Sequence, residues 1–207
     1  MKPIDLVNSK EIYNKLICEK ITEPTATNKW LVSYPFLEKI NWKAIYEIPF
    51  SITKETYLHT FQFKILNRIM NCNEKLKTWA IKTSEKCSYC DHCDTIEHHL
   101  FECHTSRKLW DQLEKWFADT LQIFHEFTIC EIIFGVINIE KHKNTLNYTI
   151  LLTKWYINNT KTQNKELLFL DLLIAIRQRI EITIQNKNII GEYENENNWQ
   201  LQLYDSL

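Results

Sequence analysis

The sequence predicts an all-α fold that is interrupted once by a compact segment rich in cysteine and histidine. Apolar residues recur at spacings of three and four along most of the 207 residues, which is the period of an amphipathic helix. Strand-like alternation is confined to Ile-Glu-Ile-Thr-Ile at 180–184, and a helix accommodates that pattern equally well. The interruption contains four of the seven cysteines: Cys87, Cys90, Cys93 and Cys103.

Before this segment, the apolar period and the turn-forming residues predict four helices. In chain order we expect a helix over 4–20, a polar linker over 22–28, a short helix bracketed by Pro35 and Pro49, a longer helix over 54–71 and a short one ending at Ile81. The longer helix is the clearest, because its apolar residues form one continuous face: Leu58, Phe61, Ile65, Leu66 and Ile69.

After the segment, further helices are expected over 106–121, 145–160, 165–186 and 199–204. Thr128 and Glu131 have the spacing of a capping box, in which a hydroxyl and a carboxylate satisfy free backbone amides at a helix start. These elements suggest four regions along the chain: 1–29 (helix and linker), 30–84 (helices leading into the cluster), 85–120 (metal-binding region) and 121–207 (C-terminal helices).

Composition and charge exclude several classes of protein. With only two glycines, the chain has no material for a phosphate-binding loop, a dinucleotide fingerprint or a nucleophile elbow. A formal net charge of −1 cannot hold nucleic acid by bulk attraction, since that requires displacing counterions from phosphate. The longest apolar stretch, 167–176, contains Asp171 and is too short to cross a bilayer. We therefore expect no membrane insertion.

Cysteine usage indicates where the chain folds. The cysteine count is odd, and the first fifteen residues lack the apolar stretch of a signal peptide. Thiols stay reduced inside cells, where clustered cysteines bind metal more often than they form disulfides. The sequence therefore predicts an intracellular protein, in the cytoplasm or the nucleus, with a metal site between residues 87 and 103.

The ligands follow from spacing, with one choice left open. Cys87 and Cys90 have the two-residue separation of a zinc knuckle, and a later His and Cys would complete a tetrahedral shell. The motif C-x2-C-x7-H-x4-C selects His98 and Cys103. A continuous α-helix would instead place His99 on the same face as Cys103. Three further residues are possible substitutes in the shell: His92, Cys93 and His104. The expected fold is thus a helical domain around a small structural zinc knuckle.

These residues resemble a known family. Asp94–Cys103 (DTIEHHLFEC), followed by Leu109-Trp110, is similar to the zinc-binding region that follows the reverse transcriptase in LINE-class (non-LTR) retrotransposon polyproteins. The helices over 42–50, 58–69 and 147–157 extend the similarity from about residue 30 to the end. In that family the histidine lies five positions before the last cysteine. The resemblance therefore implies the following zinc ligands: Cys87, Cys90, His98 and Cys103.

The resemblance also implies what the chain does. Polymerase chemistry in this family needs two adjacent aspartates, and the sequence has no such pair, so we expect a non-catalytic accessory module of a reverse transcriptase core. The family region is associated with RNA or target DNA, which predicts weak binding of RNA or single-stranded DNA. The alternative is a zinc-braced helical domain that binds protein instead. The basic residues expected to contact nucleic acid precede the cluster: Lys64, Arg68, Lys75, Lys77, Lys82 and Lys86.

Overall fold

A computed structural model of the chain describes residues 9–10, 13, 16, 24–190 and 199–207. Within these residues all regular structure is helical, and the sole β-type pairing is an isolated bridge between Lys86 and Cys93. The all-α class is therefore confirmed. The helix expected over 4–20 falls mostly outside the described residues. The contacts group the chain into two compact units, residues 1–40 and 41–207.

The described part of the first unit is a short helical pair. Helix α2 (Thr25–Ser33) is followed by a 3-10 turn, η2 (Pro35–Lys39). The polar linker expected over 22–28 is thus wrong from Thr25 onward. Thr and Asn are poor helix formers, but intrinsic propensity is a weak determinant, and α2 buries Ala26 and Trp30.

The second unit begins with three helices, and the boundaries of two differ from expectation. Helix α3 (Trp42–Ile52) contains Pro49 instead of ending before it. The missing donor of Pro49 costs a hydrogen bond, but Ile45, Pro49 and Ile52 are all buried. Helix α4 (Thr56–Leu66) ends earlier than the expected residue 71, because Arg68 adopts a left-handed conformation with φ +57°. Helix α5 (Asn73–Thr78) follows.

From His98 to Phe134 two π-turns alternate with two helices. The π-turn η3 (His98–Glu102) leads into α6 (His104–Trp116), a second π-turn η4 (Phe117–Leu121) and α7 (Ile129–Phe134). The capping box is confirmed. Thr128 Oγ1 accepts a hydrogen bond from Glu131 N at 3.3 Å, and Thr128 N donates to Glu131 Oε2 at 3.0 Å.

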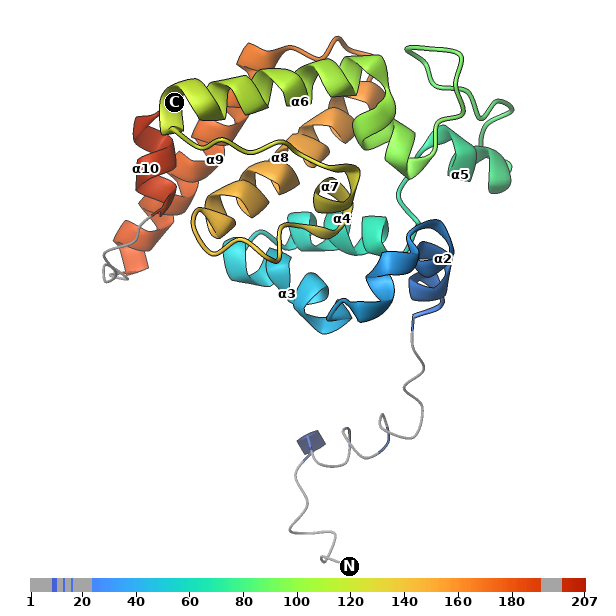
Figure 1. Ribbon diagram of the computed structural model, residues 1–207, viewed down its shortest axis with the longest axis horizontal. Coiled ribbons are helices and arrows are strands. Elements are labelled where there is room, and N and C mark those ends of the chain that lie inside the picture. Colours follow the sequence, from blue (N-terminus) through green and yellow to red (C-terminus); the bar gives the residue numbers. More distant parts are fainter. Residues whose placement is uncertain (1–8, 11–12, 14–15, 17–23, 191–198) are drawn as a thin grey trace, which may run out of the picture. The chain divides into compact units, whose positions relative to one another are not determined.

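Helix α8 (Lys143–Thr162) is the central element of this unit (Figure 1). It contacts α3, α4, α7, η3, α9 (Phe169–Ile190) and α10 (Trp199–Asp205). Residues 180–184 lie within α9, so their alternation belongs to a helix. Because η3 packs directly on α8, the second half of the Cys/His segment lies against the helical core.

Candidate metal centre

A tight loop brings the first two thiols together. The Cys87 amide donates to the His92 carbonyl at 2.9 Å, and the Asp94 amide donates to the Glu85 carbonyl at 2.8 Å. These bonds close residues 85–94 into a small hairpin that contains Cys90. The Tyr89 amide points back at Cys87 Sγ, 3.4 Å away. A backbone amide directed at sulfur favours the thiolate form, which is the form that binds metal.

Two buried polar residues attach this hairpin to the start of α5. The Asn73 amide donates to Asp94 Oδ2 at 2.9 Å, and Asn73 Nδ2 donates to the Lys86 carbonyl at 2.7 Å. Asp94 and Asn73 are both buried, so these bonds are shielded from water and hold firmly. These bonds connect the hairpin to the helical part of the chain.

The other two candidate ligands lie at the two ends of the π-turn. The Cys103 amide donates to the His98 carbonyl, five residues earlier, at 2.9 Å. A π-turn has one residue more per hydrogen-bonded ring than an α-helix. It therefore aligns positions i and i+5, whereas an α-helix aligns i and i+4. This extra residue puts His98, and not His99, beside Cys103.

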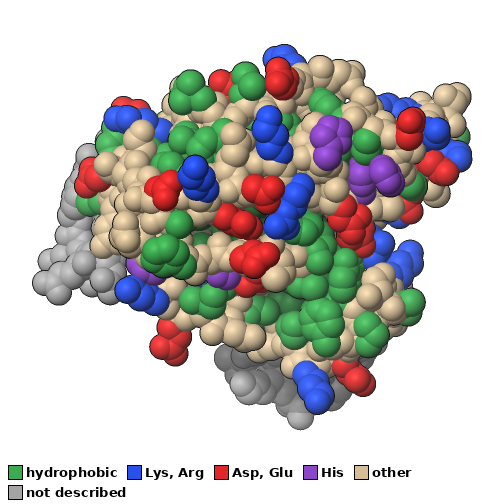
Figure 2. Space-filling model, turned by 45° about the horizontal axis from the view of Figure 1, so that its top comes forward, with side chains coloured by type: hydrophobic (Ala, Val, Ile, Leu, Met, Phe, Trp, Pro, Cys, Tyr) green, Lys and Arg blue, Asp and Glu red, His purple; other side chains and the backbone are tan. Residues whose placement is uncertain are grey.

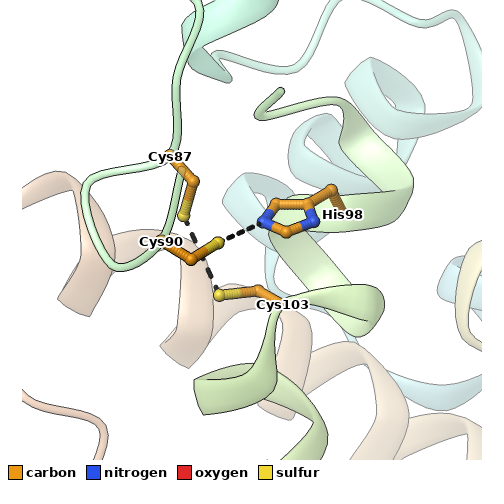
Figure 3. A group of neighbouring side chains, drawn as sticks. All are labelled: Cys87, Cys90, His98 and Cys103. Carbon is orange, nitrogen blue, oxygen red and sulfur yellow. Dashed lines mark hydrogen bonds between the residues drawn. The ribbon is translucent and has the colours of Figure 1, made fainter. Parts of the chain in front are cut away.

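The four side chains meet at one point (Figure 3). Cys87 and Cys90 come from the hairpin, and His98 and Cys103 come from the π-turn and the start of α6. Their candidate donor atoms all lie within 4.8 Å of one another. Cys87 Sγ is 3.8 Å from Cys103 Sγ, and Cys90 Sγ is 3.2 Å from His98 Nε2. One ion placed among them would contact all four.

His99 is engaged elsewhere. Its Nδ1 lies 3.0 Å from Asp94 Oδ1, and both side chains are buried. Burial disfavours the charge on Asp94, but the hydrogen bonds from His99 and from the Asn73 amide outweigh it and lower the pKa of the carboxyl. The structure therefore uses His99 to anchor the hairpin. The remaining substitutes, His92, Cys93 and His104, are exposed.

The electrostatics of the cluster suit a cation. Burial, together with the nearby Lys161, lowers the pKa of His98, which keeps the imidazole neutral and able to coordinate. Burial raises the pKa of the Cys87 thiol. For Cys103, burial is outweighed by Thr105 and Lys161, and its pKa is lowered. A bound cation would supply the charge that favours all three thiolates.

Three thiols and one imidazole without a carboxylate form a donor set for soft or borderline metal ions.

No protein-family model, no curated protein and no solved structure matches this chain. In the part of the chain that the structure describes, no helix has the length and apolarity needed to cross a bilayer.

The basic residues predicted to contact nucleic acid are mostly paired with carboxylates. The pairs and their shortest N–O distances are Arg68–Glu97 at 3.3 Å, Lys75–Glu74 at 3.3 Å, Lys77–Glu85 at 2.8 Å and Lys86–Asp91 at 3.7 Å. On the face shown in Figure 2, basic and acidic side chains are interspersed. Their sequence clustering therefore does not give a continuous positive surface.

Four of the six predicted residues are exposed, namely Lys64, Lys77, Lys82 and Lys86, and so is one aromatic side chain. Lys64 is exposed on α4, and Lys82 is exposed while donating to Asn73 Oδ1 at 2.8 Å. Trp79, which follows α5 directly, is 43% exposed. An exposed indole beside basic side chains can stack on an unpaired base. The sequence places Trp79 and Tyr89 close enough to the basic residues to stack on unpaired bases, although core packing is the commoner role of such aromatic side chains.

Proposed function

We propose that this chain is a non-catalytic, zinc-binding accessory module. The observation that supports it is the convergence of Cys87, Cys90, His98 and Cys103 on one point. A tetrahedral zinc with Zn–S bonds near 2.3 Å separates two sulfurs by about 3.8 Å, which equals the Cys87–Cys103 distance of 3.8 Å. The Cys90–His98 distance of 3.2 Å is a few tenths of an ångström below the corresponding edge, a gap that small side-chain rotations close.

The donor set favours zinc and a structural role. Cys3His shells are typical of structural zinc, and they leave no position for an activated water. The seven aspartates, at positions 5, 91, 94, 111, 119, 171 and 205, include no adjacent pair of the kind that polymerase chemistry needs. A zinc site here would fasten the hairpin to the helices and would not carry out a reaction.

We further propose that the module associates with a reverse transcriptase core and with RNA or single-stranded DNA. The resemblance of residues 94–110 to the LINE-class zinc-binding region supports this assignment. The exposed Trp79, three residues before the exposed Lys82 in the chain, offers a stacking surface near a basic residue. Because most other cations there are paired, the expected binding is weak and depends strongly on salt.

Metal analysis tests the zinc site. We expect one zinc per purified chain and, after exchange, the intense visible absorption of tetrahedral cobalt bound by thiolates. Cys103→Ser should lose the metal. The control is Cys130→Ser, because Cys130 is a half-buried cysteine on α7 outside the cluster. Absence of stoichiometric metal in the unaltered chain would overturn the proposal.

A salt titration tests the nucleic-acid part. For a fluorescent single-stranded RNA we expect the logarithm of affinity to fall by about 0.7 per log unit of salt for each phosphate neutralised. Trp79→Ala should weaken binding by roughly 5–100-fold, the effect of one lost stacking contact. The double variant Lys82→Ala/Lys86→Ala should reduce the salt slope, whereas the exposed pair Lys115→Ala/Lys141→Ala should not.

The ion pairs themselves favour a second function, a zinc-braced domain that binds protein. Exposed Ile81, 67% accessible and two residues from Trp79, would then form part of an apolar contact surface. If the zinc-loaded chain retains no RNA or DNA even at low salt, the nucleic-acid proposal fails and this alternative takes its place.

A further inference from the structure

One buried cation lies against the metal cluster and comes from a distant part of the chain. Lys161, near the end of α8, is 4% exposed. Its Nζ donates to the His99 carbonyl at 3.0 Å, and with Cys87, Tyr89 and His99 it lines one hollow beside the cluster. The same Nζ lies 5.5 Å from the centre of the Tyr89 ring. Lys161 therefore touches both the hairpin and the π-turn.

The charge of the site explains why a cation belongs there. Three thiolates, a neutral imidazole and one divalent ion together carry a single negative charge. Cys87, His98 and Cys103 are buried, and an uncompensated charge in such surroundings is costly. One ammonium group beside the site would bring the loaded assembly to neutrality.

The ammonium is held in place independently of the ion. The His99 carbonyl and the face of the Tyr89 ring fix its position, the second through a cation–π contact. The Tyr89 hydroxyl donates to the Lys165 carbonyl, so the hairpin and the chain just after α8 are joined a second time. A hollow of about 180 Å³ borders Lys161, Tyr89 and His99, which is space for several water molecules around the ammonium.

We propose that Lys161 is the built-in counter-cation of the metal centre. It is a positioning residue and not a ligand: its charge stabilises the thiolate-bound divalent ion, and its contacts tie that ion to α8. This inference rests on the proposed zinc site. It predicts that the charge at position 161 matters more than the hydrogen bond to the His99 carbonyl.

The test measures cobalt and zinc affinity in the full chain for three substitutions. Lys161→Arg keeps the charge, Lys161→Gln keeps a hydrogen-bond donor without charge, and Lys161→Met keeps neither. We expect Gln and Met to weaken both metals by roughly 10–100-fold, the usual effect of losing a group that supports metal ligands, and Arg to weaken them much less. The cobalt–thiolate band should keep its position, because the four ligands are unchanged.

A lysine on the same helix provides the control. Lys143 Nζ donates to the Ile137 carbonyl at 3.0 Å, so Lys143→Met removes the same kind of bond away from the cluster and should leave metal affinity unchanged. Affinity in Lys161→Gln equal to that of the unaltered chain would overturn the inference and leave a structural hydrogen bond. If the unaltered chain itself binds no cobalt, the proposed zinc site fails, which is a distinct result.

Discussion

The hairpin over 85–94 and the helices around α8 are stable for different reasons. The hairpin buries little apolar surface. It is closed by a few backbone hydrogen bonds and by polar anchors such as Asp94. Helix α8, in contrast, buries an apolar face that includes Leu146, Ile150 and Ile157. A segment too small to form its own core needs another source of cohesion, and a bound ion can supply it.

Two buried lysines on α8 lie in these two regions, one beside the hairpin and one in the helical core. Lys161 donates to the His99 carbonyl and lies 5.5 Å from the centre of the Tyr89 ring. Lys154, two turns earlier, is 2% exposed and donates to Gln62 Oε1 at 2.6 Å. Burial lowers the pKa of Lys154 to about 7. The first ammonium group faces a carbonyl and an aromatic ring, whereas the second has one neutral amide acceptor.

The largest effect should come from removing the ion. Cys103→Ser, or a strong chelator, is expected to cost roughly 5 kcal/mol or more of local stability, since zinc contributes about 10–16 kcal/mol to the folding of finger peptides. Hydrogen exchange should accelerate across residues 85–120 while α8 stays protected. An exchange pattern and a helical circular-dichroism signal that chelation leaves unchanged would contradict a metal-dependent hairpin.

A substitution in the helical core should produce the complementary result. Gly135 has φ +90°, and a Cβ added there would lie 2.8 Å from Ile48 Cδ1 and 2.9 Å from Asn147 Oδ1. Backbone strain and crowding together predict that Gly135→Ala lowers the free energy of unfolding by about 2–5 kcal/mol. Urea denaturation measures the loss. Metal stoichiometry should be unchanged, and a parallel loss of metal would show that the two regions are coupled.

The Lys154→Met substitution should stabilise the protein at neutral pH. The folded pKa is lowered from 10.5 to about 7, so between these values the unfolded chain binds a proton that the folded chain does not. Stability from this residue is therefore complete above pH 10.5 and is lost as the pH falls toward 7. That loss of stability reaches at most about 5 kcal/mol, and the substitution removes it. The substitution also leaves the Gln62 Oε1 acceptor without a donor, which costs about 1–3 kcal/mol.

We therefore expect a net gain of about 2 kcal/mol at pH 7, measured by urea denaturation. Between pH 7 and 8.5 the unaltered chain should gain stability relative to Lys154→Met, so the difference between them narrows as pH rises. A difference that does not depend on pH would show that Lys154 titrates normally in the folded chain.

The smallest effect should come from the helix cap of α7. Thr128→Ala removes the side-chain acceptor for the Glu131 amide and is expected to cost about 1 kcal/mol. Thr128→Asn, which restores an acceptor, should recover most of it. Thermal melts of the three proteins provide the comparison, and equal midpoints would mean that the capping box contributes nothing measurable.

Helix content and the donor cluster could be anticipated from sequence because both are local patterns. The apolar period located α4 and α8, and the spacing of Cys87 and Cys90 identified a knuckle. The choice between His98 and His99 could not be made from helical geometry, because it depends on one extra residue in the π-turn. The continuation of α3 past Pro49 was also missed. It depends on the burial of Pro49 and its neighbours, which offsets the lost hydrogen bond.

Long-range partners lay beyond any local pattern. The sequence shows that Arg68 and Lys77 are basic, but not that Glu97 and Glu85 pair with them. Likewise nothing near Cys103 in the sequence points to Lys161, which is separated from it by α6, α7 and most of α8. Charge clustering along a chain is thus a poor guide to the charge of a surface.

Cys103 belongs both to the Cys/His cluster and to the helical core. It is the residue that caps the start of α6, and its carbonyl accepts the first hydrogen bond of that helix from the Arg107 amide at 2.8 Å. A metal bound to its sulfur at the proposed site would therefore also hold the start of α6. Leu109 and Trp110 lie on the buried side of this thirteen-residue helix, so a metal at the proposed site would fasten one end of α6 in the orientation that its buried face already has.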